Sequence, residues 1–145
     1  PEVYSNLQLA SLGGRALIAN PHQLGFRDGL IVDANGKALG ERQLPGLCGQ
    51  HQGVRWMNWP QVYLRPCSTT YCLDGLTWVR KGNQSVWCDL EIDGPRHNQE
   101  ADEFRATALK LPSIRVPVEQ VKLRRTTQIF LERVESILKS HGPPR

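Results

Sequence analysis

Four acidic residues lie where the sequence otherwise predicts buried β-strands. The segment Trp87–His97 reads WCDLEIDGPRH and places Asp89, Glu91 and Asp93 on alternate residues. Asp74 lies in the preceding segment, which is also rich in β-branched and aromatic residues. Acidic side chains are disfavoured in strands and rare in protein cores. These four therefore need an explanation other than packing.

A tight hairpin would bring these acids together. Residues 70–79 and 85–92 are predicted strands, and Gly82-Asn83 is a natural two-residue turn between them. In that register Trp78 faces Trp87 and Asp74 faces Glu91. One face is then almost wholly apolar and predicts the core, with Leu73, Gly75, Thr77, Val79, Val86, Cys88, Leu90 and Ile92. The other face carries the four acids and both tryptophans.

Carboxylates facing each other suggest a cation. Directly opposed Cβ atoms lie about 4.5–5.5 Å apart, and like charges so placed destabilise a strand pair. Hard divalent cations bind oxygen ligands at about 2.0–2.6 Å, so one ion can join two such carboxylates. A merely solvated acidic face is the alternative, but it leaves the two tryptophans on that face unexplained. The pattern favours a Mg²⁺ or Mn²⁺ site.

The residues that follow resemble a known nuclease motif. Glu91–His97 reads Glu-apolar-Asp-Gly-x-x-His, Asp102–Arg105 reads Asp-x-x-Arg, and Ile114–Val118 is a short apolar strand. Together with Asp74, this order resembles the PD-(D/E)xK restriction-endonuclease-like superfamily. Within it, the pattern is closest to the branch similar to very-short-patch-repair endonucleases. The resemblance covers roughly residues 70–118.

The resemblance implies a restriction-endonuclease-like α/β fold, with a mixed central sheet flanked by helices, and metal-dependent hydrolysis of phosphodiester bonds in DNA. It implies that Asp74 and Glu91 bind the metal, with the Ile92 carbonyl as a third ligand. Asp93 stands where much of the superfamily has lysine, and would hold a second metal or orient the attacking water. His97 would act as general acid or base, or bind phosphate.

Three further residues would support this site: Asp89, Asp102 and Arg105. Asp102 and Arg105 are spaced i, i+3 on a predicted helix, so a simple surface ion pair is the competing interpretation. The acidic helix residue that usually precedes the first core strand of the superfamily is not recognisable here. The alternative function is therefore a catalytically inactive nucleic-acid-binding or interaction module of a larger protein.

A structural zinc site is a second metal hypothesis. Its candidate ligands are Cys48, His51, Cys67 and Cys72, in the order CxxH and then CxxxxC. Against zinc, Cys72 is equally well explained as a buried thiol like Cys88, because free cysteine is among the most buried residue types.

The charge balance is compatible with DNA as a partner. The formal net charge is +4, which weakly favours polyanions. The candidate DNA-binding residues are Arg80, Lys81, Arg96, Lys122, Arg124 and Arg125, with an ordinary solvated surface as the alternative. The four tryptophans, Trp56, Trp59, Trp78 and Trp87, would stack on bases or simply pack.

The chain of 145 residues has the length of one domain. Residues 1–65 are expected to form an N-terminal hairpin and loop region, and residues 66–145 the nuclease core. Asn35-Gly36 predicts a turn between two strands over Leu30–Leu39. Glycine, glutamine and proline predict an irregular loop over Gly40–Trp59, followed by a first core strand at Gln61–Arg65.

Two amphipathic helices complete the predicted core. The first spans Asn98–Leu111 before Pro112, and the residues expected on its buried face are Ala101, Phe104, Ala108 and Leu111. The second spans Thr127–Ser140 before Gly142, and the residues expected on its buried face are Phe130, Val134, Ile137 and Leu138.

Localisation is expected to be cytoplasmic, because the sequence has no secretory signal and no apolar run of about 20 residues. We expect no membrane partner. The chain begins with Pro1 rather than Met, so other domains of a longer protein are expected partners. The sequence does not specify the DNA that is cut or the oligomeric state.

Overall fold

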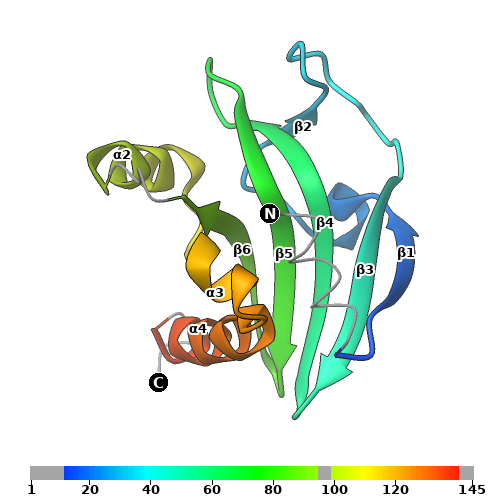
Figure 1. The fold of residues 1–145 in the computed structure, drawn as a ribbon. Coiled ribbons are helices and arrows are strands. Elements are labelled where there is room, and N and C mark those ends of the chain that lie inside the picture. Colours follow the sequence, from blue (N-terminus) through cyan, green and yellow to red (C-terminus); the bar gives the residue numbers. More distant parts are fainter. Residues whose placement is uncertain (1–11, 95–98, 141–145) are drawn as a thin grey trace.

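The protein folds into a seven-stranded β-sheet against which helices pack (Figure 1). The structure, a computed structural model, describes residues 12–94 and 99–140, without the side chains of 99–103. Its strands are β1 (Arg15–Ala19), β2 (Leu30–Val32), β3 (Leu44–His51), β4 (Val54–Arg65), β5 (Tyr71–Lys81), β6 (Gln84–Asp93) and β7 (Ser113–Pro117). Its helices are the 3₁₀ helix η1 (Pro21–Leu24), α2 (Gln99–Leu109), α3 (Val118–Lys122) and α4 (Thr126–Ser140).

The strand order is β1-β3-β4-β5-β6-β7, and β2 pairs with one end of β4. All these pairs are antiparallel except β6–β7, which is parallel and is connected through α2. The predicted α/β class and mixed sheet are therefore confirmed at this level. The sheet also joins the predicted N-terminal region (residues 1–65) to the predicted core (residues 66–145), because β4 (residues 54–65) pairs with β5.

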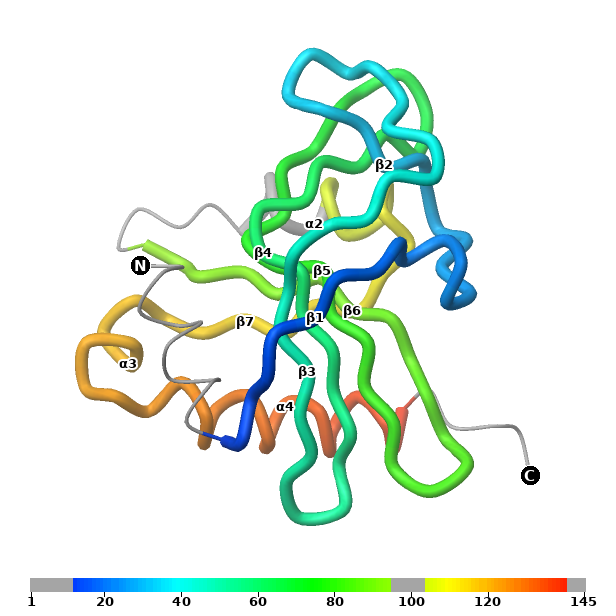
Figure 2. The backbone as a smooth tube through the Cα atoms, turned by 90° about the vertical axis from the view of Figure 1, so that its right-hand side faces the viewer, coloured from blue at the N-terminus to red at the C-terminus, as the bar shows by residue number. Residues whose placement is uncertain are grey.

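Two apolar clusters cover opposite faces of the sheet. Figures 1 and 2 show α3 and α4 on one face and η1 on the other. Under α4, its buried residues Phe130 and Val134 pack with Val79, Cys88 and Leu90 of the hairpin. The other cluster contains Phe26, Trp59, Leu64, Leu76 and Leu109. The predicted apolar stripe of the last helix is confirmed, while Gly142 lies outside the described residues.

The hairpin register is as predicted, with Trp78 opposite Trp87 and a turn at Gly82-Asn83. The expected inner face is right for Val79, Cys88 and Leu90 but wrong for Leu73, which packs in the other cluster. The alternation of side chains between the two faces of the sheet reverses at Asp74. Gln61 on β4, which is opposite Asp74, has a positive φ of 55°, and the β4–β5 ladder has no pair at this position. Beyond that gap, side chains change face.

The predicted loop over Gly40–Trp59 is wrong, because β3 and the first half of β4 lie there. Two glycines that suggested a loop instead allow close packing. A Cβ on Gly49 would lie 2.6 Å from the Trp56 ring, and one on Gly46 would lie 2.5 Å from the Asn58 carbonyl oxygen. Both glycines are therefore required by close approach within a strand pair.

The turn at Asn35-Gly36 is present, although β2 is followed by a single bridge, Val32 to Ala38, rather than a second strand. Asp33 stabilises this turn by accepting hydrogen bonds from the backbone N–H groups of Asn35 (2.8 Å) and Lys37 (3.0 Å).

The helix predicted over Asn98–Leu111 is found as α2, and the following strand as β7. Its predicted apolar face is wrong at Phe104, which is 72% exposed. The prediction is right at Leu111, which is buried, and Leu109 is buried as well although it was not predicted on that face. Lys110 between them has a positive φ of 56° that ends the helix. Among the described residues, no helix is long and apolar enough to cross a membrane.

Candidate functional site

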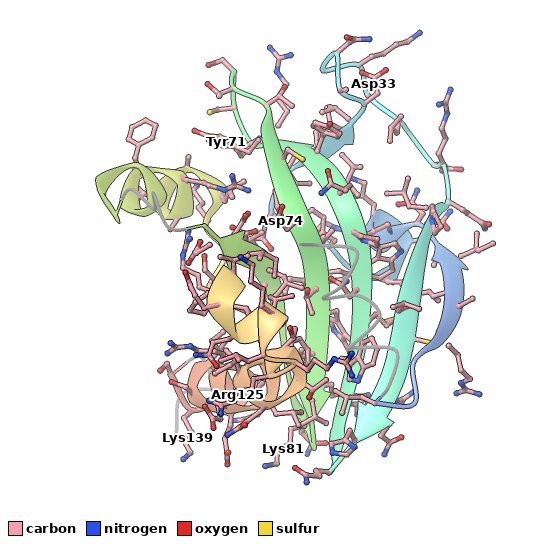
Figure 3. The ribbon with its side chains drawn as sticks, viewed as in Figure 1. Asp33, Tyr71, Asp74, Lys81, Arg125 and Lys139 are labelled. Atoms are coloured by element: carbon pink, nitrogen blue, oxygen red, sulfur yellow. The ribbon has the colours of Figure 1, made fainter. Side chains whose placement is uncertain are left out.

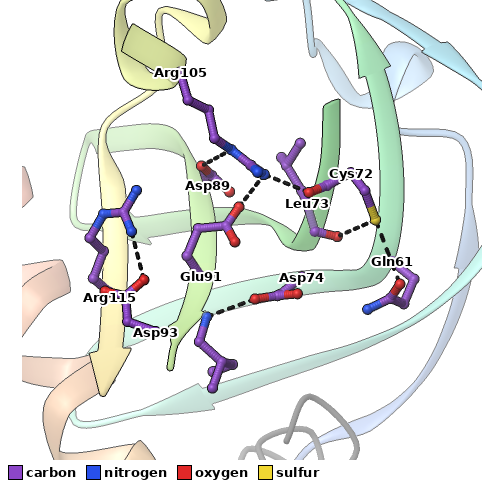
Figure 4. A network of polar contacts seen from close by, with 10 residues as sticks. Gln61, Cys72, Leu73, Asp74, Asp89, Glu91, Asp93, Arg105 and Arg115 are labelled. Atoms are coloured by element: carbon purple, nitrogen blue, oxygen red, sulfur yellow. Dashed lines mark hydrogen bonds and ion pairs between the residues drawn. The ribbon is translucent and has the colours of Figure 1, made fainter. Parts of the chain in front are cut away.

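The candidate site lies where β5 and β6 separate. The ladder between these strands ends at the pair Gly75–Leu90, one step before Asp74 and Glu91. Here the Asp74 carboxylate replaces a backbone partner, because its Oδ2 accepts a hydrogen bond from the Ile92 N–H at 2.7 Å. This contact holds the Asp74 side chain against the end of β6, beside the other acids (Figure 4).

Arg105 of α2 joins two of these acids (Figure 4). Its Nη2 donates to Oε1 of Glu91 and to the Cys72 carbonyl oxygen, the latter at 2.6 Å. Its Nε lies 3.7 Å from Oδ2 of Asp89. The guanidinium carbon lies 5.9 Å from the centre of the Tyr71 ring. Arg105 therefore contacts the acidic cluster directly, and its supporting role in a functional site stays a prediction.

The carboxyl groups of Asp89 and Glu91 are buried, not solvated. Asp89 is 1% exposed, and among the described residues its carboxyl oxygens have no hydrogen-bond partner other than the neighbouring Glu91 carboxyl group. Burial raises the pKa of Asp89, against the opposing effects of Glu91 and Arg105. Burial also raises the pKa of Glu91, and the neighbouring Asp89 carboxyl raises it further. The interpretation of this face as a solvated surface is therefore wrong at these two residues.

The raised pKa values predict that stability falls as pH rises. The folded chain keeps a proton that the unfolded chain releases near its ordinary pKa of about 4.3. The free energy of unfolding should therefore decrease above about pH 5, by up to about 1.4 kcal/mol per pH unit for one proton. Urea unfolding with chelator from pH 5 to pH 8 measures this slope. Glu91→Gln should flatten it, whereas the control Glu41→Gln, at an exposed site, should leave it unchanged.

Asp93 has a different cationic partner, Arg115 of β7. Arg115 Nη1 donates to Asp93 Oδ1 at 2.7 Å (Figure 4). The parallel β6–β7 register places Arg115 beside Glu91. Arg115 is not among the site residues that the sequence predicts. Recognising that Ile114–Val118 pairs in parallel with β6 would have identified it.

The structure thus brings together Asp74, Asp89, Glu91, Asp93 and Arg105, all of them predicted site residues. The Ile92 contact with Asp74 is made by its N–H, and the role of its carbonyl stays a prediction. His97 and Arg96 lie outside the described residues, as does the side chain of Asp102.

The chain was compared with protein families, curated proteins and solved structures. No protein-family model, no curated protein and no solved structure matches the chain. The site must therefore be interpreted from its own geometry.

The four residues predicted to bind zinc are not brought together: Cys48, His51, Cys67 and Cys72. Cys48 is paired with Met57 and Cys72 with Tyr63, both on β4. At about 3.3 Å a residue, these partners lie about 20 Å apart. The zinc hypothesis is therefore wrong. Over the described residues, no three His, Cys, Asp or Glu side chains are arranged as a metal-binding group.

The predicted DNA-binding residues do not form one patch around the acids. Arg80 and Lys81 are at the hairpin end of β5, about 20 Å along the strand from Asp74. Lys81 lies 3.9 Å from Glu135 of α4 in an exposed ion pair. Lys122, Arg124 and Arg125 are exposed where α3 meets α4 (Figure 3 labels Arg125).

Base stacking is excluded for two of the tryptophans. Trp56 and Trp59 are buried. Trp59 stacks on Trp87 with ring centroids 5.7 Å apart, and Trp56 contacts Phe130. For these rings the packing interpretation is correct.

Proposed function

We propose that the protein is a divalent-metal-dependent DNA endonuclease that hydrolyses phosphodiester bonds, in repair, restriction or mobile-element defence. The observation that carries this proposal is the concentration of Asp74, Asp89, Glu91 and Asp93 at the separating ends of β5 and β6. Structural packing does not require such a cluster, because each buried carboxylate is costly to desolvate. The order of hairpin, helix and parallel strand agrees with the motif order that the nuclease resemblance predicts.

Two carboxylates of the cluster are donors of the kind that a hard cation prefers, and other ligands would have to complete the site. Asp74 and Glu91 offer carboxylate oxygens, the ligands that Mg²⁺ and Mn²⁺ prefer. The buried Asp89 carboxyl group lies beside them, next to the Glu91 carboxyl and 3.7 Å from Arg105 Nε. Arg105 already neutralises part of the negative charge of the cluster through Glu91. Metal binding at Glu91 therefore requires that this carboxylate use its other oxygen or release Arg105.

In this proposal Asp74 and Glu91 hold the metal, with the Ile92 carbonyl as a further ligand. A bound divalent ion lowers the pKa of a water molecule and stabilises charge on a phosphate oxygen. The chain's own residues orient the site. Arg105 keeps Asp89 and Glu91 in place, and Asp93 holds Arg115 beside them.

Arg115 supplies a positive charge next to the position where the superfamily usually has lysine. Its partner Asp93 keeps the guanidinium near Glu91, where a substrate phosphate would lie. His97 acts as general acid or base in this scheme, or binds phosphate when protonated.

Plasmid nicking tests the proposal. Supercoiled plasmid incubated with the protein and Mg²⁺ or Mn²⁺ should become nicked or linear, and an excess of chelator should prevent this. The control omits the protein and keeps the metal. Supercoiled plasmid that persists with both metals would contradict the proposal.

A catalytically inactive nucleic-acid-binding or interaction module is the second candidate. One observation favours it: Arg105 already contacts Glu91 and Asp89, so the cluster has an internal cation. In such a module the acids and Arg105 only stabilise the junction of α2 with the sheet. DNA binding without nicking in either metal would select this candidate.

A further inference from the structure

A second feature of the sheet lies away from the acidic cluster, toward the hairpin end of β5. Four side chains form one row across four strands, because each is directly opposed to the next: Arg15, Cys48, Met57 and Trp78. The neighbouring row contains Gln50, Arg55 and Arg80. We call Arg15, Gln50, Arg55, Trp78 and Arg80 the basic sheet face.

This face is turned away from α4. Val54 and Val79 pack in the cluster under α4. Since alternate residues of a strand point to opposite faces, their neighbours Arg55 and Arg80 point to the other side of the sheet. Arg15, Gln50, Arg55 and Arg80 are all exposed.

The basic sheet face concentrates positive charge that no carboxylate of the described residues neutralises. Arg55 and Arg80 are directly opposed, an arrangement that destabilises a strand pair. Within the described residues, no carboxylate lies within ion-pair distance of Arg15, Arg55 or Arg80. Arg80 uses only its Nε locally, donating to the Gly82 carbonyl oxygen at 2.9 Å. The remaining guanidinium N–H groups are suited to an external anion.

An aromatic ring lies beside these charges in a groove. The groove has a volume of about 390 Å³, and its lining includes Arg15, Cys48, Gln50, Arg55, Met57 and Trp78. Trp78 is half-buried, and it is the one tryptophan whose ring contacts no other aromatic ring in the described chain. Arginines around an available indole ring are the combination that binds a sugar–phosphate backbone and an unpaired base.

We propose that the basic sheet face binds a single-stranded nucleic acid, with the three arginines on phosphates and a base stacked on Trp78. A single strand fits better than a duplex because only an unpaired base can present its face to a ring in a groove. This surface goes beyond the proposed cleavage site and does not depend on it. Binding here requires neither a metal nor Glu91.

Fluorescence anisotropy of a labelled oligothymidylate, in chelator and over a series of NaCl concentrations, tests this surface. Arg55→Gln with Arg80→Gln should raise Kd about tenfold or more. It should also flatten the plot of log affinity against log salt by roughly 1.4, at about 0.7 for each lost phosphate contact. Trp78→Leu should raise Kd about tenfold with the salt slope unchanged. It should also reduce the quenching of tryptophan fluorescence by the oligonucleotide.

The matched control is Arg133→Gln with Lys139→Gln, which removes the same charge from exposed sites on α4. This control should bind as the wild type does. The urea midpoint of the double arginine variant should not fall, because the substitution removes a like-charge pair. A lower midpoint would attribute its weaker binding to unfolding and overturn the assignment of the arginines.

Three other results would overturn the proposal. Absence of binding to the oligonucleotide excludes the surface outright. Equal weakening by the α4 control shows that net charge alone drives binding. If a duplex binds as tightly as the single strand and Trp78→Leu does not weaken that binding, the basic sheet face binds the duplex backbone rather than an unpaired base. None of these depends on whether the protein nicks plasmid, so failure of this surface is distinguishable from failure of the proposed endonuclease activity.

Discussion

Metal-dependent nicking should fall to the level seen with chelator when Glu91 is replaced by glutamine. The amide keeps the size of the side chain and can still accept a hydrogen bond from Arg105 through its oxygen. It removes the negative charge with which the proposed site would bind a hard cation. The measurement is the rate of plasmid nicking in Mg²⁺ and in Mn²⁺ at matched protein concentrations.

The same variant should not lose stability at neutral pH. Glu91 is buried and its pKa is raised chiefly by burial, so a neutral amide avoids the cost of an ionised carboxyl group there. A gain of about 1 kcal/mol in the free energy of unfolding at pH 8 is expected. Glu41→Gln, at an exposed site, controls for the change in net charge. Full nicking by Glu91→Gln would remove Glu91 from the proposed metal site.

The hairpin that carries the site was predictable from local pattern alone. Gly82-Asn83 determines the turn, and the alternation of Val86, Cys88 and Leu90 with polar residues determines the register. The acids that gather at the end of β6 were found for the same reason. Local periodicity and turn chemistry depend only on neighbouring residues, so they can be read without knowledge of the fold.

The burial of the acids was not predictable in this way. Alternating acids are the usual sign of a solvated face, and only the placement of α2 by the β6–α2–β7 crossover brings Arg105 over Asp89 and Glu91. The break at Gln61, which reverses the alternation so that Leu73 packs in the second cluster, is likewise a feature of the β4–β5 pairing. Such effects come from contacts between segments distant in sequence.

Two further predictions were wrong, one based on glycine content and the other on the spacing of apolar residues in a helix. The glycines of Gly40–Trp59 predict a loop, whereas Gly46 and Gly49 allow Asn58 and Trp56 to approach the strand. Phe104 was placed on a buried face by its spacing, but it is exposed on α2. A short helix at the edge of a sheet buries few of its residues, so apolar spacing within it is a weak guide.

Arg105→Ala should produce the largest loss of stability, about 3 kcal/mol at pH 8. Removing one partner of a buried ion pair leaves the other charge uncompensated, at a cost of about 3–5 kcal/mol. The lower end applies here because the Arg105 side chain is 22% exposed. The loss should be smaller at pH 5, because Asp89 and Glu91 hold a proton more readily there. Urea unfolding with chelator at both pH values measures it.

Adding Mn²⁺ then separates the two candidate functions. If Asp74, Asp89 and Glu91 bind a divalent ion, the ion replaces the missing guanidinium and stabilises only the folded chain. Mn²⁺ should therefore restore more stability to Arg105→Ala than it adds to the wild type, whose Glu91 is already engaged by Arg105. Arg133→Ala on α4, at an exposed site, is the control and should show no such gain. An Arg105→Ala variant that loses stability but gains none from Mn²⁺ would show that the acids serve only as partners for arginine, as in the inactive module.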